Sequence, residues 1–281
     1  MLVTTRKMLD DARDGGYAIG AFNAENAEMV WAIVRAADEL RAPVIIQTTS
    51  STLKYFSPEM FAGMVKAEAQ KTDVPVALHL DHGSSYELCC ACIAAGYTSV
   101  MIDGSALPFE ENIAVSKKVA DYAKSFGVPV EAELGRVGGK EDDVVGVDDQ
   151  YTDPKEAVEF VERTGVSSLA IGIGTAHGIY KVAPKLDLDR AADIRKVVSI
   201  PLVMHGASGL ADEVMQEGVR KGIAKINFAT ELRVAFSEAV KAYLEKDPKV
   251  FDPKKYGTPA REAVKELVKQ KMTVCGCNGK A

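Results

Sequence analysis

Short apolar runs alternate with longer amphipathic stretches from one end of the chain to the other. The short runs are rich in Val, Ile, Leu and Ala, which is typical of buried parallel strands. The pattern predicts strands over residues 18–23, 43–48, 75–81, 99–104, 129–134, 168–174, 201–205 and 224–227. Proline opens four of these runs, at positions 43, 75, 129 and 201, where it removes no donor from the strand ladder.

The stretches between the strands have the spacing of amphipathic helices. They cover residues 25–39, 58–71, 86–95, 109–126, 154–164, 188–197 and 211–221. A further helix is predicted over 231–246, followed by a break at Asp252-Pro253. We expect the final helix to start at Thr258-Pro259, because Thr is a good N-cap and Pro suits the first helical position.

Eight strands, each followed by a helix, predict a (β/α)8 TIM barrel with extra C-terminal helices, spanning residues 1–281 as a single domain. A doubly wound sheet is the alternative, but it usually has fewer strands. It also gives no reason for polar residues at the carboxyl end of every strand. Such residues recur here at Asn23, Thr48, Asp81, Asp103, Glu131, Glu133, His177, His205 and Asn227. Barrels build their active sites from these ends.

Composition and charge narrow the class of protein. The chain has 281 residues, 47% of them hydrophobic, which is enough for a full core. The net charge of −6 argues against binding to nucleic acid or to an anionic membrane. With neither a long apolar run nor a signal-peptide pattern, we expect a cytoplasmic protein. We expect its five cysteines to be reduced and mostly structural, with a metal or redox role as the alternative.

Three of the four histidines follow strand-like runs in the same topological position. A lone histidine is usually structural, but His82, His177 and His205 would meet at one end of a barrel. Three neutral imidazoles with an open fourth position suit a catalytic Zn²⁺. The fourth histidine, His79, lies two residues before Asp81 on the same strand face, which favours a supporting role.

Two acidic residues are candidates for proton transfer. Asp81 directly precedes His82, so it can exchange a proton with a substrate oxygen that the metal polarises. The alternative is a capping carboxylate, or one that orients a metal ligand. Glu141 lies in a glycine-punctuated acidic loop that could close over the site. A solvated acidic loop is an equally good interpretation of that stretch.

Small residues after the last two strands indicate an anion site. Residues 205–209 (HGASG) and 227–230 (NFAT) would expose backbone N–H groups and the Ser208 hydroxyl near helix starts. Gly178, beside His177, could add another N–H. Barrels commonly bind phosphate at this place. The residues alone therefore predict a metal-dependent barrel enzyme that acts on a phosphorylated small molecule.

The same residues resemble the class II, metal-dependent ketose-bisphosphate aldolases. The shared motifs run in the family's order from about residue 20 to the C-terminus. They include HLDHGS at 79–84, SVMIDGS at 99–105, EAELG at 131–135, GTAHG at 174–178, HGASG at 205–209 and KIN at 225–227.

This resemblance implies reversible cleavage of a ketose 1,6-bisphosphate into dihydroxyacetone phosphate and glyceraldehyde 3-phosphate. One Zn²⁺ per subunit would be held by His82, His177 and His205, and Glu133 matches a carboxylate that holds a displaced metal in some members. Asp81 would exchange the proton of the C4 oxygen. Glu141 would handle the proton at the enediolate carbon.

The resemblance also implies substrate contacts and an assembly. Arg233 matches a basic residue that reaches the second phosphate in relatives. A monovalent cation (Na⁺ or K⁺) near the phosphate and a homodimer or homotetramer are further implications. The implied substrate residues are Asn23, Thr49, Gly178, Lys181, Gly206, Ala207, Ser208, Asn227, Ala229, Thr230 and Arg233.

Tagatose and fructose bisphosphates differ only at C4, and the resemblance favours tagatose. Fructose-preferring relatives tend to carry Asp or Asn where this chain has Ala229, and the CGCNGKA tail at 275–281 is similar to the tagatose branch. Loss of the Asp is also consistent with loose specificity, so the fructose enzyme is the alternative. Residues 47–52 (QTTSST) depart from the glycine-containing loops of many relatives, which leaves the contact of Thr49 open.

Three rival interpretations remain. One is a barrel enzyme of the same kind that cleaves a phosphorylated inositol breakdown product. Another is a non-catalytic companion subunit that binds sugar phosphates, although such a protein would be expected to lose ligands or the loop acid. The third is a thiol–metal regulator, which would retain metal after the histidines are removed.

Overall fold

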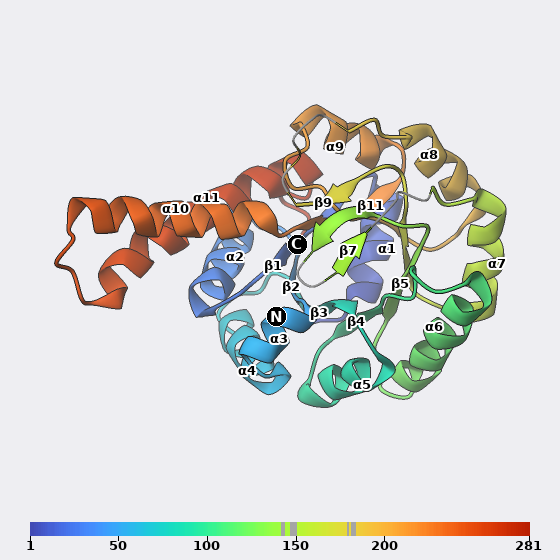
Figure 1. The fold of residues 1–281 in the computed structure, drawn as a ribbon, viewed down its shortest axis with the longest axis horizontal. Coiled ribbons are helices and arrows are strands. Elements are labelled where there is room, and N and C mark those ends of the chain that lie inside the picture. The colour runs from blue at the N-terminus through green and yellow to red at the C-terminus, as the bar shows by residue number, and fades with distance from the viewer. Residues whose placement is uncertain (142–143, 147–150, 179, 181–183) are drawn as a thin grey trace.

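Eight parallel strands form a closed barrel at the centre of the molecule (Figure 1). The computed structural model describes residues 1–141, 144–146, 151–178, 180 and 184–281. The barrel order is β1-β11-β10-β8-β5-β4-β3-β2, and the predicted (β/α)8 barrel is therefore confirmed. Its strands are β1 (Ile19–Asn23), β2 (Val44–Thr48), β3 (Val76–Gly83), β4 (Ser99–Ile102), β5 (Val130–Leu134), β8 (Ser168–Ile171), β10 (Leu202–Met204) and β11 (Ile223–Phe228).

The helices pack around the outside of the barrel (Figure 1). Their apolar faces bury large side chains such as Ile33, Phe61 and Phe160 against the strands, which forms the main core. The helices are α1 (Thr5–Gly15), α2 (Ala27–Leu40), α3 (Ser50–Tyr55), α4 (Pro58–Ala69), α5 (Tyr86–Ala95), α6 (Phe109–Lys124), α7 (Pro154–Thr164), α8 (Leu188–Val197), α9 (Asp212–Arg220), α10 (Thr230–Lys246) and α11 (Pro253–Cys275).

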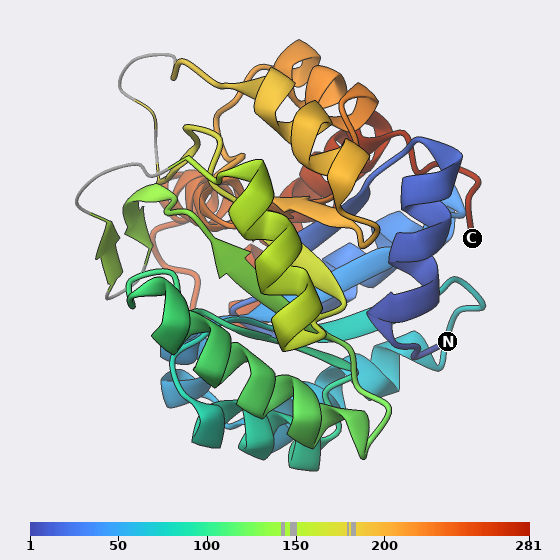
Figure 2. The same ribbon diagram turned by 90° about the vertical axis from the view of Figure 1, so that its right-hand side faces the viewer.

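A small second sheet stands at one end of the barrel. It joins β6 (Gly138–Glu141) to β7 (Val144–Gly146) as an antiparallel pair, and β6 to β9 (Ala176–His177) in parallel. Figure 2 shows both chain termini at the opposite end of the barrel from this sheet. The sheet therefore lies beside the carboxyl ends of the barrel strands, and β9 brings His177 to them.

Alternation along the strands makes the inside of the barrel polar. On β3, Val76, Leu78 and Leu80 alternate with Ala77, His79 and Asp81. The second set faces the barrel axis, because His79 and Asp81 contact side chains of β11 and β1. The same period of two on the other strands gives two polar layers inside the barrel. The lower contains His79, Glu131 and Lys225, and the upper contains Asn23, Gln47, Asp81 and Asn227.

Two short helices were not among the predicted elements. Helix α1 lies at the end of the barrel where the termini are (Figure 2), and it buries Met8, Leu9 and Ala12. Its Thr5 hydroxyl donates to Ser99 Oγ at 3.0 Å, below the polar layers. Helix α3 follows β2 at the opposite end, within the hydroxyl-rich run that departs from many relatives.

The prediction that the final helix starts at Thr258-Pro259 is wrong. Helix α11 begins at Pro253, and the Asp252 side chain caps it by accepting a hydrogen bond from the N–H of Lys254. Asp-Pro here is thus an N-cap followed by proline at N1, a better start than the one we chose. Pro259 lies inside the helix. Helices α10 and α11 pack against each other and extend past the barrel as an arm (Figure 1).

All five cysteines are free thiols, as predicted, and all except Cys90 are buried. Burial raises the pKa of Cys89 and of Cys277 to about 12, so neither is a reactive thiolate near neutral pH. Within the described part of the chain, no helix combines the length and the apolar character needed to cross a membrane.

Gly83 is required where β3 meets β4. A Cβ at this position would lie 2.2 Å from the carbonyl oxygen of Met101, a backbone atom that cannot turn away. We expect Gly83→Ala to lower the free energy of unfolding by about 1–3 kcal/mol, the usual range for overpacking. Urea unfolding followed by circular dichroism measures this change.

The matched control is Gly63→Ala in the exposed part of α4, where a Cβ meets nothing within 4 Å. There alanine should stabilise the helix by up to about 1 kcal/mol. Equal effects of the two substitutions would contradict the steric argument.

Candidate active site

The end of β3 places two consecutive side chains in the mouth of the barrel. In a regular strand, neighbouring residues point to opposite faces, so Asp81 and His82 would diverge. Here the pairing with β4 shifts register between Leu80 and Gly83, and His82 has a left-handed backbone with φ 46°. Bulges redirect side chains, and a non-glycine residue in this conformation stores strain that is common at functional sites. The distortion brings an acid and an imidazole into one site.

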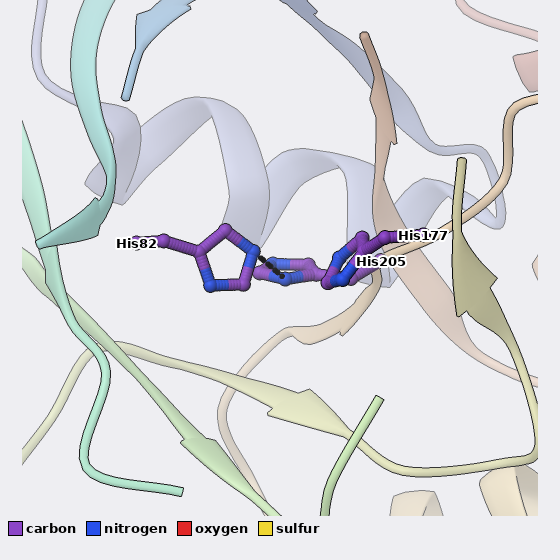
Figure 3. Close-up of side chains that lie close together, drawn as sticks. All are labelled: His82, His177 and His205. Carbon is purple, nitrogen blue, oxygen red and sulfur yellow. Dashed lines mark hydrogen bonds between the residues drawn. The ribbon is translucent and has the colours of Figure 1, made fainter. Parts of the chain in front are cut away.

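Three imidazoles meet in this mouth (Figure 3). His82 comes from β3, His177 from β9, and His205 follows β10. Nε2 of His82 lies 3.0 Å from Nδ1 of His205, and one ring nitrogen from each of the three lies within 4.8 Å of the others. In a tetrahedral zinc site with Zn–N bonds of about 2.0–2.1 Å, nitrogens are about 3.3 Å apart. The three rings therefore fit a divalent metal.

Two carboxylates determine which ring nitrogen faces the metal position. Oδ2 of Asp103 lies 2.8 Å from Nδ1 of His82, and Oε1 of Glu131 lies 2.9 Å from Nε2 of His205. The other ring nitrogens, Nε2 of His82 and Nδ1 of His205, therefore face each other. Burial would raise the pKa of Asp103, but its hydrogen bond with His82 and the charge of that ring hold the pKa below its usual range. Carboxylates in this position fix the tautomer and orientation of metal-binding histidines.

The surroundings of His205 are built to hold a positive charge. Burial alone would lower the pKa of this ring, but hydrogen bonds to Glu131 and Glu133 outweigh it and raise the pKa to about 9. Oε2 of Glu133 lies 3.3 Å from Nδ1 of His205. A cation bound between these groups would take the place of that proton. Glu133 also forms a second candidate ligand set with His82 and Asp103, as needed for a displaced metal position.

A buried lysine balances the charge beneath the histidines. Nζ of Lys225 lies 2.9 and 3.1 Å from the two oxygens of Glu131 and 3.4 Å from Nε2 of His79. Burial would raise the pKa of Glu131, but chiefly the charge of Lys225 keeps it below its usual range. Burial, and then the same lysine charge, lowers the pKa of His79 well below its usual value. His79 is thus a neutral group in the layer below the metal position.

Asp81 lies at the centre of a ring of amides. Its Oδ2 accepts hydrogen bonds from Asn23 Nδ2 at 2.9 Å and Gln47 Nε2 at 3.2 Å, and its Oδ1 accepts one from Asn227 Nδ2 at 3.0 Å. The four side chains come from β1, β2, β3 and β11. Three fixed donors hold the carboxylate beside His82. A carboxylate placed in this way can take a proton from a substrate hydroxyl.

A small hollow beside the histidines has the features of a phosphate site. Thr230 begins α10, and the N–H of Ala229 donates to Ser208 Oγ at 3.3 Å. Gly206 has φ 65°, and a Cβ there would lie 2.7 Å from the carbonyl oxygen of Ala176. Backbone N–H groups and hydroxyls at a helix start suit an anion. The hollow is lined by His177, Gly178, Gly206, Ser208, Asn227, Ala229, Thr230 and Arg233.

The remaining predicted residues are placed as follows. Ala207 is fully buried, between two residues that line the hollow. The hydroxyl of Thr49 contacts Ser51 and Thr52 at the start of α3, so it belongs to the hydroxyl-rich turn. Lys181 lies outside the described residues. So does the side chain of Glu141, whose backbone ends β6.

Comparisons with known proteins agree with this geometry. The family model for class II fructose-bisphosphate aldolase matches residues 3–280. The YdjI aldolase from Escherichia coli K12 is 40% identical, with all of each chain covered and a TM-score of 0.89. The chain belongs to the class II fructose-bisphosphate aldolase family. It is an aldolase.

Two further structures support the same fold. A protein from Coccidioides immitis assigned as a fructose-1,6-bisphosphate aldolase is 28% identical, covers 98% of this chain and 96% of its own, and has a TM-score of 0.88. The fructose-bisphosphate aldolase of Campylobacter jejuni is 24% identical, covers 100% of this chain and 97% of its own, and has a TM-score of 0.85. The likeness to the Campylobacter jejuni enzyme concerns the fold alone.

Sequence reasoning did not assign a role to four polar residues of this aldolase. The sequence marks Asp103 and Glu131 only as polar strand ends, Lys225 only as part of the KIN motif, and Gln47 only as part of the run at 47–52. The signal that indicates Glu131 and Lys225 is the period of two. Glu131 precedes Glu133 by two residues on β5, and Lys225 precedes Asn227 by two on β11, so each pair faces the barrel axis.

We expect Lys225→Met to weaken binding of a divalent metal by about 10–100-fold, the usual effect of disturbing residues behind metal ligands. Without Lys225, Glu131 would be a buried charge with less compensation and would no longer hold His205 firmly. Competition with a chromophoric chelator measures the affinity. Glu131→Gln should recover part of the loss in the double variant, because it removes the uncompensated charge.

Lys271→Met is the control for this change. Lys271 is also buried, but it pairs with Glu231 at 3.1 Å, away from the histidines. Its replacement should leave metal affinity within about twofold. If Lys225→Met bound metal as tightly as this control, the role of the lysine would be structural only.

Proposed function

We propose that this aldolase cleaves a ketose 1,6-bisphosphate reversibly by a zinc-dependent reaction. His82, His177 and His205 would hold the Zn²⁺. The observation that supports this most strongly is the convergence of three ring nitrogens, two of them oriented by Asp103 and Glu131, in a cradle that favours positive charge. Imidazole nitrogens with an open position suit zinc. When bound, Zn²⁺ would act as a Lewis acid on the substrate carbonyl.

The residues of the chain would then divide the proton transfers. Asp81 takes the proton of the C4 hydroxyl, the C3–C4 bond breaks, and C4 becomes the aldehyde carbon. The electron pair of the broken bond stays with the three-carbon phosphate half, and C3 then accepts a proton, which we assign to Glu141. Asn23 and Asn227 hold Asp81 in place. Ser208, Thr230 and Gly178 would bind the C1 phosphate in the hollow, with Gly206 and Asn227 beside them.

The C4 epimer is the finer part of the proposal, and we favour tagatose 1,6-bisphosphate over fructose 1,6-bisphosphate. Ala229 lines the hollow between Asn227 and Thr230 and offers no side-chain acceptor there. An acidic residue at this position could accept a hydrogen bond from one C4 epimer, so alanine removes that preference.

A homodimer or homotetramer also stays a proposal. The α10–α11 arm extends past the barrel (Figure 1). At its tip Phe251 is 92% exposed, and Val234 and Leu244 on α10 are exposed as well. Apolar side chains of this size on a projecting element are typical of contacts between subunits. We also propose a monovalent cation near the phosphate, which rests on the resemblance. The cytoplasmic location rests on the composition.

The direct test is a coupled assay for triose phosphate release from both bisphosphates, run with zinc and after chelation. We expect cleavage that chelation abolishes and zinc restores. Zinc bound at one ion per chain without cleavage would favour the inositol-type rival or the companion subunit. Cleavage that survives chelation and is trapped by borohydride would contradict the metal mechanism.

Replacing Asp81 by Ala should lower kcat by about 10²–10⁴-fold while zinc stays bound at one ion per chain. The loss is expected because no other described carboxylate sits in the amide ring. Steady-state kinetics and metal analysis of the same sample measure both effects. Full activity in this variant would remove Asp81 from the mechanism.

Replacing Ala229 by Asp should raise the kcat/KM ratio of fructose to tagatose bisphosphate, by up to about tenfold for one added hydrogen bond. The substitution should be tolerated, because Ala229 is the N-cap of α10 and Asp is a favourable residue there. An unchanged ratio would place the epimer preference elsewhere.

A further inference from the structure

The two ends of the substrate would lie over different strands of the barrel. In the proposed reaction the C1 phosphate occupies the hollow at β10 and β11, and the C4 oxygen lies at Asp81 on β3. Asp81 is bonded to Asn23 on β1 and Gln47 on β2. The chain of carbons beyond C4 would then continue over the ends of β1 and β2, and the residues that follow those strands would meet the far end of the substrate.

The acidic side chain of Glu25 occupies this region. Glu25 follows β1 and precedes Asn26, which is the N-cap of α2, so it lies in the loop rather than in the helix predicted there. Its Oε1 accepts from Arg233 Nε at 2.7 Å, and Nη2 of the same arginine lies 2.6 Å away. Its Oε2 accepts from the Thr52 hydroxyl at 2.7 Å. Both oxygens are held by elements that follow β11 and β2.

The contact between Glu25 and Arg233 changes how Arg233 can interact with a phosphate. Arg233 lines the phosphate hollow and was predicted to reach the second phosphate. Two nitrogens of its guanidinium instead contact one oxygen of the Glu25 carboxylate. A phosphate monoester carries a charge of about −1.5 to −2 at neutral pH. To use Arg233, it would have to approach Glu25 and compete with it.

We infer that Glu25 is a specificity residue that selects an uncharged far end of the substrate. The aldehyde half would end in a hydroxyl, and the enzyme would act on ketose 1-phosphates at least as well as on the 1,6-bisphosphates. A hydroxyl can donate to the carboxylate of Glu25 without disturbing its pair with Arg233. This inference rests on the proposed aldol reaction and concerns only the half of the substrate beyond C4.

The test runs the reaction in the direction of synthesis with zinc-loaded enzyme. Dihydroxyacetone phosphate is the common donor, and the acceptor is either glyceraldehyde or glyceraldehyde 3-phosphate, which differ only in the phosphate. For the native chain we expect kcat/KM for glyceraldehyde to equal or exceed that for glyceraldehyde 3-phosphate. Glu25→Gln should shift the ratio toward the phosphorylated acceptor by about tenfold, the effect of removing one partly screened charge.

Glu28→Gln is the matched control, since it removes the same charge from an exposed site on α2, three residues along the chain. It should leave the acceptor ratio within about twofold. Replacing Arg233 by Met in the Glu25→Gln background should cancel the shift, because the released guanidinium is the group that would bind the phosphate.

Two results would overturn the inference while leaving the aldolase reaction in place. One is a native preference for glyceraldehyde 3-phosphate of more than about tenfold, and the other is a ratio that Glu25→Gln does not change. Failure of both acceptors to react with zinc bound would instead contradict the proposed function itself. The comparison of the two acceptors uses only the native chain, so its result does not depend on whether any variant folds.

Discussion

The contact between Glu131 and His205 determines the geometry of the whole site. Glu131 is fully buried inside the barrel, where an ionised carboxylate without compensation would cost several kcal/mol. Lys225 supplies the opposite charge from below, and His205 supplies a hydrogen bond from above. Because Nε2 of His205 is engaged in this way, only Nδ1 can face the other histidines. The buried Lys225–Glu131 pair thus determines that Nδ1 of His205 faces the other histidines at the mouth of the barrel.

Strain at the end of β3 is the second requirement. A regular strand would place Asp81 and His82 on opposite faces, and the carboxylate and the imidazole would then be separated. The register shift and the left-handed backbone at His82 remove this conflict. Gly83 allows the strand to pass within contact of the Met101 carbonyl directly afterwards. The neighbouring contacts of His82 with Asp103 and of Asp81 with its amides hold the strained segment in place.

Much of the fold was predictable because its signals are local. Strands that start at proline and end in polar residues, separated by amphipathic stretches, specify a barrel without any long-range information. The start of α11 differs from the prediction because two Xaa-Pro pairs lie there, and Asp252 is the better N-cap of the two. The histidine cluster could be expected from topology. The amide ring around Asp81 and the Lys225–Glu131 pair could not, since each depends on which side chains of separate strands reach the same height in the barrel.

The two halves of the site differ in how they are built, and this bears on how specificity can vary. The hollow at β10 and β11 relies on glycines, backbone N–H groups and two hydroxyls, and a Cβ at Gly206 would clash with the carbonyl oxygen of Ala176. Beyond Asp81, the surroundings are side chains that follow β1, β2 and β11, and Glu25 of the loop after β1 contacts both Thr52 of α3 and Arg233 of α10. A loop side chain can be exchanged without altering the barrel. In the proposed reaction, a single change of charge at Glu25 would therefore alter the aldehyde half that is accepted and leave the proton transfers assigned to Asp81 as they are.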